Sequence, residues 1–139
     1  MATERRLWFD LWVHLDGTQI WQLPPDLALD VGDCEGILTT IEYAAVGPGA
    51  TGVVGTGVSW KLRRSAEPTA DDTAYEDMDP TAFAPARTAG KRNAAYGADG
   101  APGAKYPRGY LSVQFTNAAA LGTWVALHVR GWIAIQGQR

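Results

Sequence analysis

The sequence is poor in the residues on which several classes of protein depend. Its 139 residues include one cysteine, Cys34, so an internal disulfide and a site of several thiolates are both excluded. Its longest apolar stretches fall well short of the roughly 20 residues that a helix needs to cross a bilayer. Its N-terminus lacks the basic, apolar and small-residue series of a signal peptide. We therefore expect stability to come from packing or assembly, and we expect no membrane partner.

An excess of positive charge is also missing. Fifteen acidic and 12 basic residues give a net charge of −3, and the basic residues are scattered apart from short pairs at Arg5-Arg6 and Arg63-Arg64. A nucleic-acid backbone is usually bound by a clustered basic surface. The composition therefore predicts no nucleic-acid partner. At this length we expect one domain that spans residues 1–139.

The last thirty residues show the alternation of β-strands and no helical periodicity. In residues 110–116, Leu111, Val113 and Phe115 alternate with polar residues, as on a strand with one buried face. We therefore predict a core strand here and a longer one over residues 124–135. The aliphatic positions that face the core on this longer strand are Val125, Leu127, Val129, Ile133 and Ile135.

Earlier parts of the chain show the same alternation. Asp16-Gly17 favours a tight hairpin turn, so residues 1–23 are predicted to form a tryptophan-rich N-terminal hairpin or arm. Trp60 is the predicted core anchor of a later strand. The predicted strands in this part of the chain are residues 7–15, 19–23, 36–46 and 58–63.

Glycine and proline interrupt the strands throughout the chain, which has 16 Gly and 8 Pro. Residues 80–107 are rich in Ala, Gly and Pro, and they are predicted to form a long irregular loop. Short alternating strands without an amphipathic helix predict an all-β fold. We expect an antiparallel β-sandwich that is jelly-roll-like and carries this long loop.

No group of residues has the spacing of a catalytic or metal site. The two histidines, His14 and His128, share no local ligand spacing with Cys34, and the acidic segment at residues 71–79 lacks the order of a calcium loop. No serine stands in a Gly-x-Ser-x-Gly setting. We predict that the protein is not an enzyme and holds no cofactor or metal ion.

The tryptophans of the first and last strands are the most informative side chains. They alternate with the aliphatic residues of these strands, so they are expected on the opposite face. Because each strand already has a complete apolar face, indoles on the other side need a separate cover. We therefore predict a protein–protein interface on this side. Its predicted residues are Trp8, Trp12, Trp124, Arg130 and Trp132.

Four strand segments occur in a suggestive order: EYAA at 42–45, GVSWKL at 57–62, RGYLSVQF at 108–115 and WVALHVRG at 124–131. A polar insertion at residues 65–79 separates the second segment from the third. This order resembles that of the small β-sandwich proteins that decorate or cement the capsids of tailed bacteriophages. The resemblance covers about two-thirds of the chain.

The resemblance implies a structural virion protein that binds an assembled shell and stabilises it by bridging capsid subunits. The implied partners are the major capsid protein and further copies of the chain, with a trimer favoured. The implied location is the capsid surface of a virion assembled in the host cytoplasm. Two alternatives stay open: a neck or tail protein of a virion, and a carbohydrate-binding or other ligand-binding β-sandwich module whose exposed tryptophans stack on sugar rings.

Overall fold

The computed structural model describes residues 4–17, 19–47, 57–79, 81–85, 87–97, 108–118 and 124–138. These residues contain no α-helix, and hence no helix long and apolar enough to cross a membrane. The described residues include the short 3₁₀ turns η1 (Pro25–Leu27) and η3 (Asp72–Ala74). The strands are β1 (Arg6–Asp16), β2 (Gln19–Gln22), β3 (Leu29–Val46), β4 (Val58–Ser65), β5 (Glu76–Asp77), β6 (Ala89–Gly97), β7 (Arg108–Asn117) and β8 (Trp124–Gln138).

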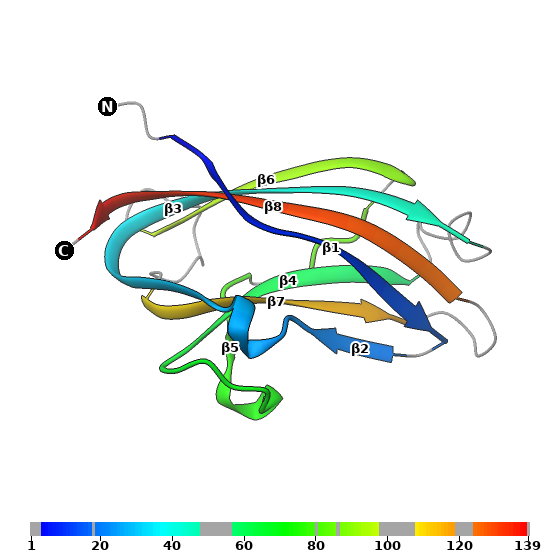
Figure 1. Cartoon of the computed structure of the whole chain (residues 1–139), viewed down its shortest axis with the longest axis horizontal. Coiled ribbons are helices and arrows are strands. Elements are labelled where there is room, and N and C mark those ends of the chain that lie inside the picture. The colour runs from blue at the N-terminus through cyan, green and yellow to red at the C-terminus, as the bar shows by residue number, and fades with distance from the viewer. Residues whose placement is uncertain are drawn as a thin grey trace.

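Two antiparallel sheets pack against each other (Figure 1). Sheet A has the strand order β1-β8-β3-β6. In sheet B, β7 pairs with β4 on one side and with β2 and the start of β3 on the other, and β5 adds to β4. Strand β3 joins the sheets, because residues 29–33 pair with β7 and residues 34–46 pair with β8. The predicted antiparallel β-sandwich is confirmed.

The core lies between the two sheets and consists of the alternate aliphatic and aromatic positions of their strands. Val113, Phe115, Leu127 and Val129 have no exposed surface, and Trp60 is 1% exposed. This burial confirms the predicted core strands and the predicted core anchor. The indole of Trp60 lies 5.6 Å from the Phe115 ring between centroids, so aromatic contacts add to the aliphatic packing.

Of the predicted hairpin or arm at residues 1–23, the hairpin pairing is wrong. Strand β1 pairs with β8 in sheet A, whereas β2 pairs with β7 in sheet B. Between the two strands Gly17 has a φ of 54°, a value that glycine adopts at little cost, and the chain passes there from one sheet to the other. A four-residue β2 could offer β1 only a short ladder, whereas β8 pairs along nearly all of it.

The predicted start of one strand and the predicted long loop are also corrected. Strand β3 begins at Leu29, well before the predicted residue 36. Residues 89–97, predicted to be part of an irregular loop, form β6 and pair with β3 along their whole length. Large apolar residues are nearly absent from β6, so it has no hydrophobic period to recognise, and its extended state comes from its hydrogen bonds to β3. Residues 98–107 of the predicted loop lie outside the described residues.

Candidate functional site

The outer side of sheet A carries the exposed ring of Trp12 together with the half-buried rings of Trp124 and Trp132. The first residues of β1 stand off from the rest of the sheet (Figure 1). Trp12 is 59% exposed on the outer side, and it points away from Val13 and Leu15, which have no exposed surface. We call this outer surface of β1, β8, β3 and β6 the sheet A face. Because the core is complete without it, the sheet A face is the candidate site.

A β-bulge decides which residues of β1 reach the sheet A face. The pairing shifts by one residue between Leu7, opposite Trp132, and Phe9, opposite Gly131. The bulge turns Leu7 outward, where it is 46% exposed, and turns Phe9 into the core. Space for the Phe9 ring exists because residue 131 is glycine: a Cβ there would lie 2.4 Å from the ring.

The same bulge removes Trp8 from the predicted interface. Trp8 is half-buried and packs against the core cluster, with its ring 5.1 Å from the Phe9 ring in an edge-on arrangement. Its indole N–H donates a hydrogen bond of 2.8 Å to the carbonyl oxygen of Leu27 in η1. The alternation of the sequence placed Trp8 beside Trp12, but one extra residue in the strand reversed its direction.

Two aromatic stacks tie β1 to β8 on the sheet A face. The rings of Trp12 and His128 are stacked with centroids 5.0 Å apart and planes 15° apart. The rings of His14 and Trp124 are stacked with centroids 5.3 Å apart and planes 22° apart. Each stack joins one tryptophan to one histidine from the neighbouring strand, so the face presents flat, ordered rings.

Asp10 lies at the centre of an ion-pair cluster beside the first stack. Its Oδ1 is 2.6 Å from Nε2 of His128. Its Oδ2 is 3.3 Å from Nε of Arg130, which is close enough for an ion pair, although that N–H is not aligned for a hydrogen bond. All three side chains are between about a third and a half exposed, so this cluster orders the surface more than it stabilises the fold.

Trp132 is held in place from two directions. Its indole N–H donates a hydrogen bond of 2.6 Å to Oε1 of Glu42 on β3. The guanidinium carbon of Arg130 lies 5.5 Å from the centroid of the indole, in range for a cation–π contact. Glu42, Arg130 and Trp132 therefore form one connected group across β3 and β8.

Two shallow hollows lie over β3, between the side chains of β8 and β6, and Glu42 borders both. The first has a volume of about 370 Å³ and is lined by Arg5, Thr40, Glu42, Lys91 and Trp132. The second has a volume of about 200 Å³ and is lined by Glu42, Tyr43, Ala44, Gly90, His128 and Arg130.

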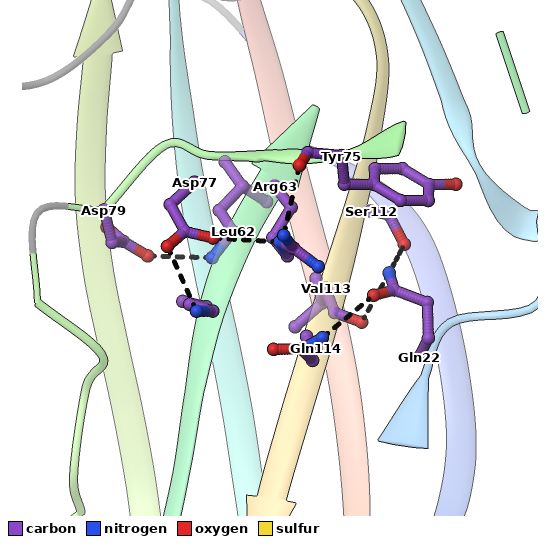
Figure 2. Close-up of polar contacts among 10 residues, drawn as sticks. Gln22, Leu62, Arg63, Tyr75, Asp77, Asp79, Ser112, Val113 and Gln114 are labelled. Carbon is purple, nitrogen blue, oxygen red and sulfur yellow. Dashed lines mark hydrogen bonds and ion pairs between the residues drawn. The ribbon is translucent and has the colours of Figure 1, made fainter. Parts of the chain in front are cut away.

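The outer side of sheet B differs, because several of its polar side chains form hydrogen bonds or ion pairs with one another (Figure 2). Ser112 and Gln114 are buried there and share hydrogen bonds with Gln22. Arg63 donates a hydrogen bond of 3.1 Å to the carbonyl oxygen of Tyr75, and its guanidinium carbon lies 5.8 Å from the Tyr75 ring centroid. This side therefore offers fewer free aromatic surfaces than the sheet A face.

Three acidic residues of the segment before β6, Asp71, Asp77 and Asp79, have partners within the chain. Partial burial opposes ionisation of Asp77, but Lys61 and Arg63 outweigh it and lower the pKa of this carboxyl group. Asp71 accepts hydrogen bonds from the hydroxyl and the backbone N–H of Thr73, which lower its pKa. Among the described residues no three His, Cys, Asp or Glu side chains are grouped as metal ligands.

Asp79 forms the most deeply buried charged contact in this segment. Its side chain is 3% exposed and pairs with Arg92, whose Nη2 lies 3.0 Å from Oδ1. It also accepts hydrogen bonds from the Tyr96 hydroxyl at 2.6 Å and the Leu62 backbone N–H at 2.8 Å. Because Leu62 lies in sheet B and Tyr96 in sheet A, this carboxylate links the two layers.

The structure brings together four of the five predicted interface residues: Trp12, Trp124, Arg130 and Trp132 all lie on the sheet A face. The interface predicted from the sequence did not include Asp10, Glu42 or Lys91, which complete the charged part of this face. The alternation of β3 already placed Glu42 opposite the core positions, but its position beside Arg130 depends on the pairing of β3 with β8. No protein-family model and no curated protein matches the chain.

Proposed function

We propose that the chain is a structural virion protein of the capsid decoration or cement type, which acts through protein–protein contacts and catalyses no reaction. The observation that supports this role most directly is the sheet A face, where ordered aromatic and charged side chains lie outside a complete core. Exposed aromatic residues with Arg are the usual composition of a protein interface. The order of strand patterns in the sequence points in the same direction.

The proposed mechanism is additive. Each bound copy bridges neighbouring capsid subunits, so expansion or rupture of the shell must first break those contacts. A ligand that binds only the intact shell stabilises it by mass action. Many weak contacts on one particle then reinforce it together. The protein would act on the capsid surface, after the shell has assembled in the host cytoplasm.

The test uses shells assembled from the major capsid protein of the same genome. We expect the purified chain to co-sediment with these shells, to saturate at a fixed number of copies per shell, and to raise the temperature at which they rupture. Trp12→Ala should weaken binding, and Lys61→Ala, on the other sheet, serves as the matched control. Shells that neither retain nor are stabilised by the wild-type chain would refute the decoration role. Mass spectrometry of separated heads and tails distinguishes it from a neck or tail role.

A second candidate function, glycan binding, is favoured by the first hollow. An indole wall at Trp132, with Thr40, Glu42 and Lys91 around it, provides both a stacking surface and hydrogen-bonding groups of the kind that bind sugar rings. A glycan array screened with the labelled chain, followed by titration of tryptophan fluorescence, tests it. Saturable binding that Trp132→Ala abolishes supports this function, and an array without a hit opposes it.

A further inference from the structure

The charges that cross the middle of the sheet A face alternate in sign. Strand pairing places Asp10 beside Arg130, Arg130 beside Glu42, and Glu42 beside Lys91. The row therefore runs negative, positive, negative, positive from one edge of sheet A to the other. Such a row is complementary to its own reversed copy, since reversal sets every charge against the opposite sign.

Side-chain size changes in the same direction across the face. The row on one side of the charges contains Trp12 and His128 on β1 and β8, but Ala44 and Ala89 on β3 and β6. In this row bulky side chains therefore occupy the β1/β8 half of the sheet A face and small ones occupy the β3/β6 half, whereas farther along the strands Val46 on β3 lies beside Ala126 on β8. The row on the other side shows a similar trend, and its members are Leu7, Trp132, Thr40 and Asn93.

The two hollows lie on the half with small side chains. Thr40 borders the first hollow, and Ala44 borders the second. The exposed ring of Trp12 and the ring of Trp132 lie on the other half. If the face is laid against its own reversed copy, its projecting rings therefore lie opposite its hollows, just as each charge lies opposite a charge of the other sign.

We infer that the occupant of the sheet A face is the same face of a second copy of this chain, related by a two-fold axis. The axis runs parallel to the strands, between β8 and β3, so that β8 covers the partner's β3 and β1 covers the partner's β6. Asp10 then faces the partner's Lys91, and Arg130 faces the partner's Glu42. This inference rests on the proposed function, because it takes the sheet A face to be a protein–protein contact.

The same arrangement matches the shapes of the two halves. Trp132 faces the partner's Thr40 and enters the larger hollow, and Trp12 faces the partner's Ala89 beside the smaller one. Val46, which is 47% exposed, faces the partner's Ala126. Two sheets that pack face to face normally cross at about −30° because of their twist, so the best match is expected at the charged row near the centre.

The size of the face is sufficient for a specific but modest interface. Four strands at about 4.8 Å spacing and about nine residues at 3.3 Å rise give a plane of roughly 600 Å². Stable complexes of standard size bury about 800 Å² on each partner, and side-chain relief raises the contact area above that of a plane. An isologous contact of this kind closes as a dimer. It differs from the trimer that the resemblance implies, since a cyclic trimer joins two different patches.

The experiment that tests this inference is a charge exchange measured by analytical ultracentrifugation. The variants are Asp10→Lys and Lys91→Glu, each with its fold checked by circular dichroism. In a two-fold dimer residue 10 of each copy faces residue 91 of the other, so each variant alone places like charges opposite each other at both positions. We therefore expect its Kd for self-association to rise about tenfold or more. In an equal mixture the two variants pair with opposite charges, and the Kd should return to within about threefold of the wild type.

Restored association in the mixture, together with a wild-type dimer at about 100 μM, supports the inference. A variant that merely unfolded could not be rescued by mixing. A dimer that neither variant weakens, or weakened association that mixing does not restore, overturns the two-fold contact. A wild-type chain that is monomeric at this concentration but binds shells through Trp12 overturns the inference and leaves the proposed function in place. A chain that neither self-associates nor binds shells overturns both.

Discussion

Trp12 and His128 stack across β1 and β8 with ring centroids 5.0 Å apart, yet Trp12 stays 59% exposed. The six tryptophans of the sequence can serve either as core residues or as surface residues. Trp60, at 1% exposure, fills the core between the sheets. Trp12 lies on a surface that the core does not need, and this difference leads to the first prediction.

Trp12→Ala should leave the fold nearly unchanged, whereas Trp60→Ala should not. Loss of the stack with His128 is expected to cost about 1 kcal/mol, and loss of the buried indole about 3–5 kcal/mol. Urea unfolding of both variants, at concentrations low enough to keep the chain monomeric, measures the difference. If Trp12→Ala cost as much as Trp60→Ala, Trp12 would have to be treated as a core residue.

Asp79→Asn should be far more destabilising than Asp77→Asn. The first substitution leaves the Arg92 charge without its anion in a buried site, which typically costs about 3–5 kcal/mol. Asp77 has a side chain that is 43% exposed, and its pairs with Lys61 and Arg63 are expected to contribute about 1 kcal/mol or less. The free energy of unfolding near pH 7 tests the comparison. Equal losses would show that Asp79 does not carry the link between the sheets.

Tyr96 should make the fold sensitive to alkaline pH. Burial raises the pKa of its hydroxyl, and the adjacent Asp79 carboxylate raises it further. In the unfolded chain the pKa of tyrosine is about 10, so the folded protein keeps this proton at pH values where the unfolded chain has lost it. The stability due to this group is therefore complete below about pH 10 and decreases as the pH rises toward the folded pKa.

The measurement is the slope of the free energy of unfolding between pH 10 and 12, for the wild type and for Tyr96→Phe. The wild type should lose about 1.4 kcal/mol more per pH unit than the variant. The variant controls for the titration of all other groups, which both proteins share. Parallel slopes would mean that Tyr96 loses its proton equally easily in the folded and unfolded chains.

Gly131→Ala should destabilise the protein through Phe9. The added Cβ would lie 2.4 Å from the ring, and overpacking of this kind costs about 1–3 kcal/mol. Combination with Phe9→Val should remove most of this cost, because the smaller side chain vacates the space. A double-mutant cycle gives the coupling between the two sites. Additive losses would indicate that Gly131 is needed for a reason other than room for Phe9.

The direction of side chains in the longest strands was determined by the sequence alone. Successive side chains of a strand point to opposite faces, so the local order of apolar and polar residues was enough to assign Phe115 and Leu127 to the core and Trp12 and Trp132 to the outside. The same rule failed at Trp8, where a single extra residue against β8 reversed the alternation.

Which strand lies beside which was decided only by the tertiary structure. The pairing of β1 with β8 joins the two ends of the chain, and the pairing of β3 with β6 turns a segment without large apolar residues into a strand. Such pairings depend on hydrogen bonds between segments that are distant in the sequence, so a local pattern of residues does not predict them. The row from Asp10 to Lys91 has the same origin: each charge is visible in the sequence, but their alternation across the sheet A face exists only because four strands align in this register.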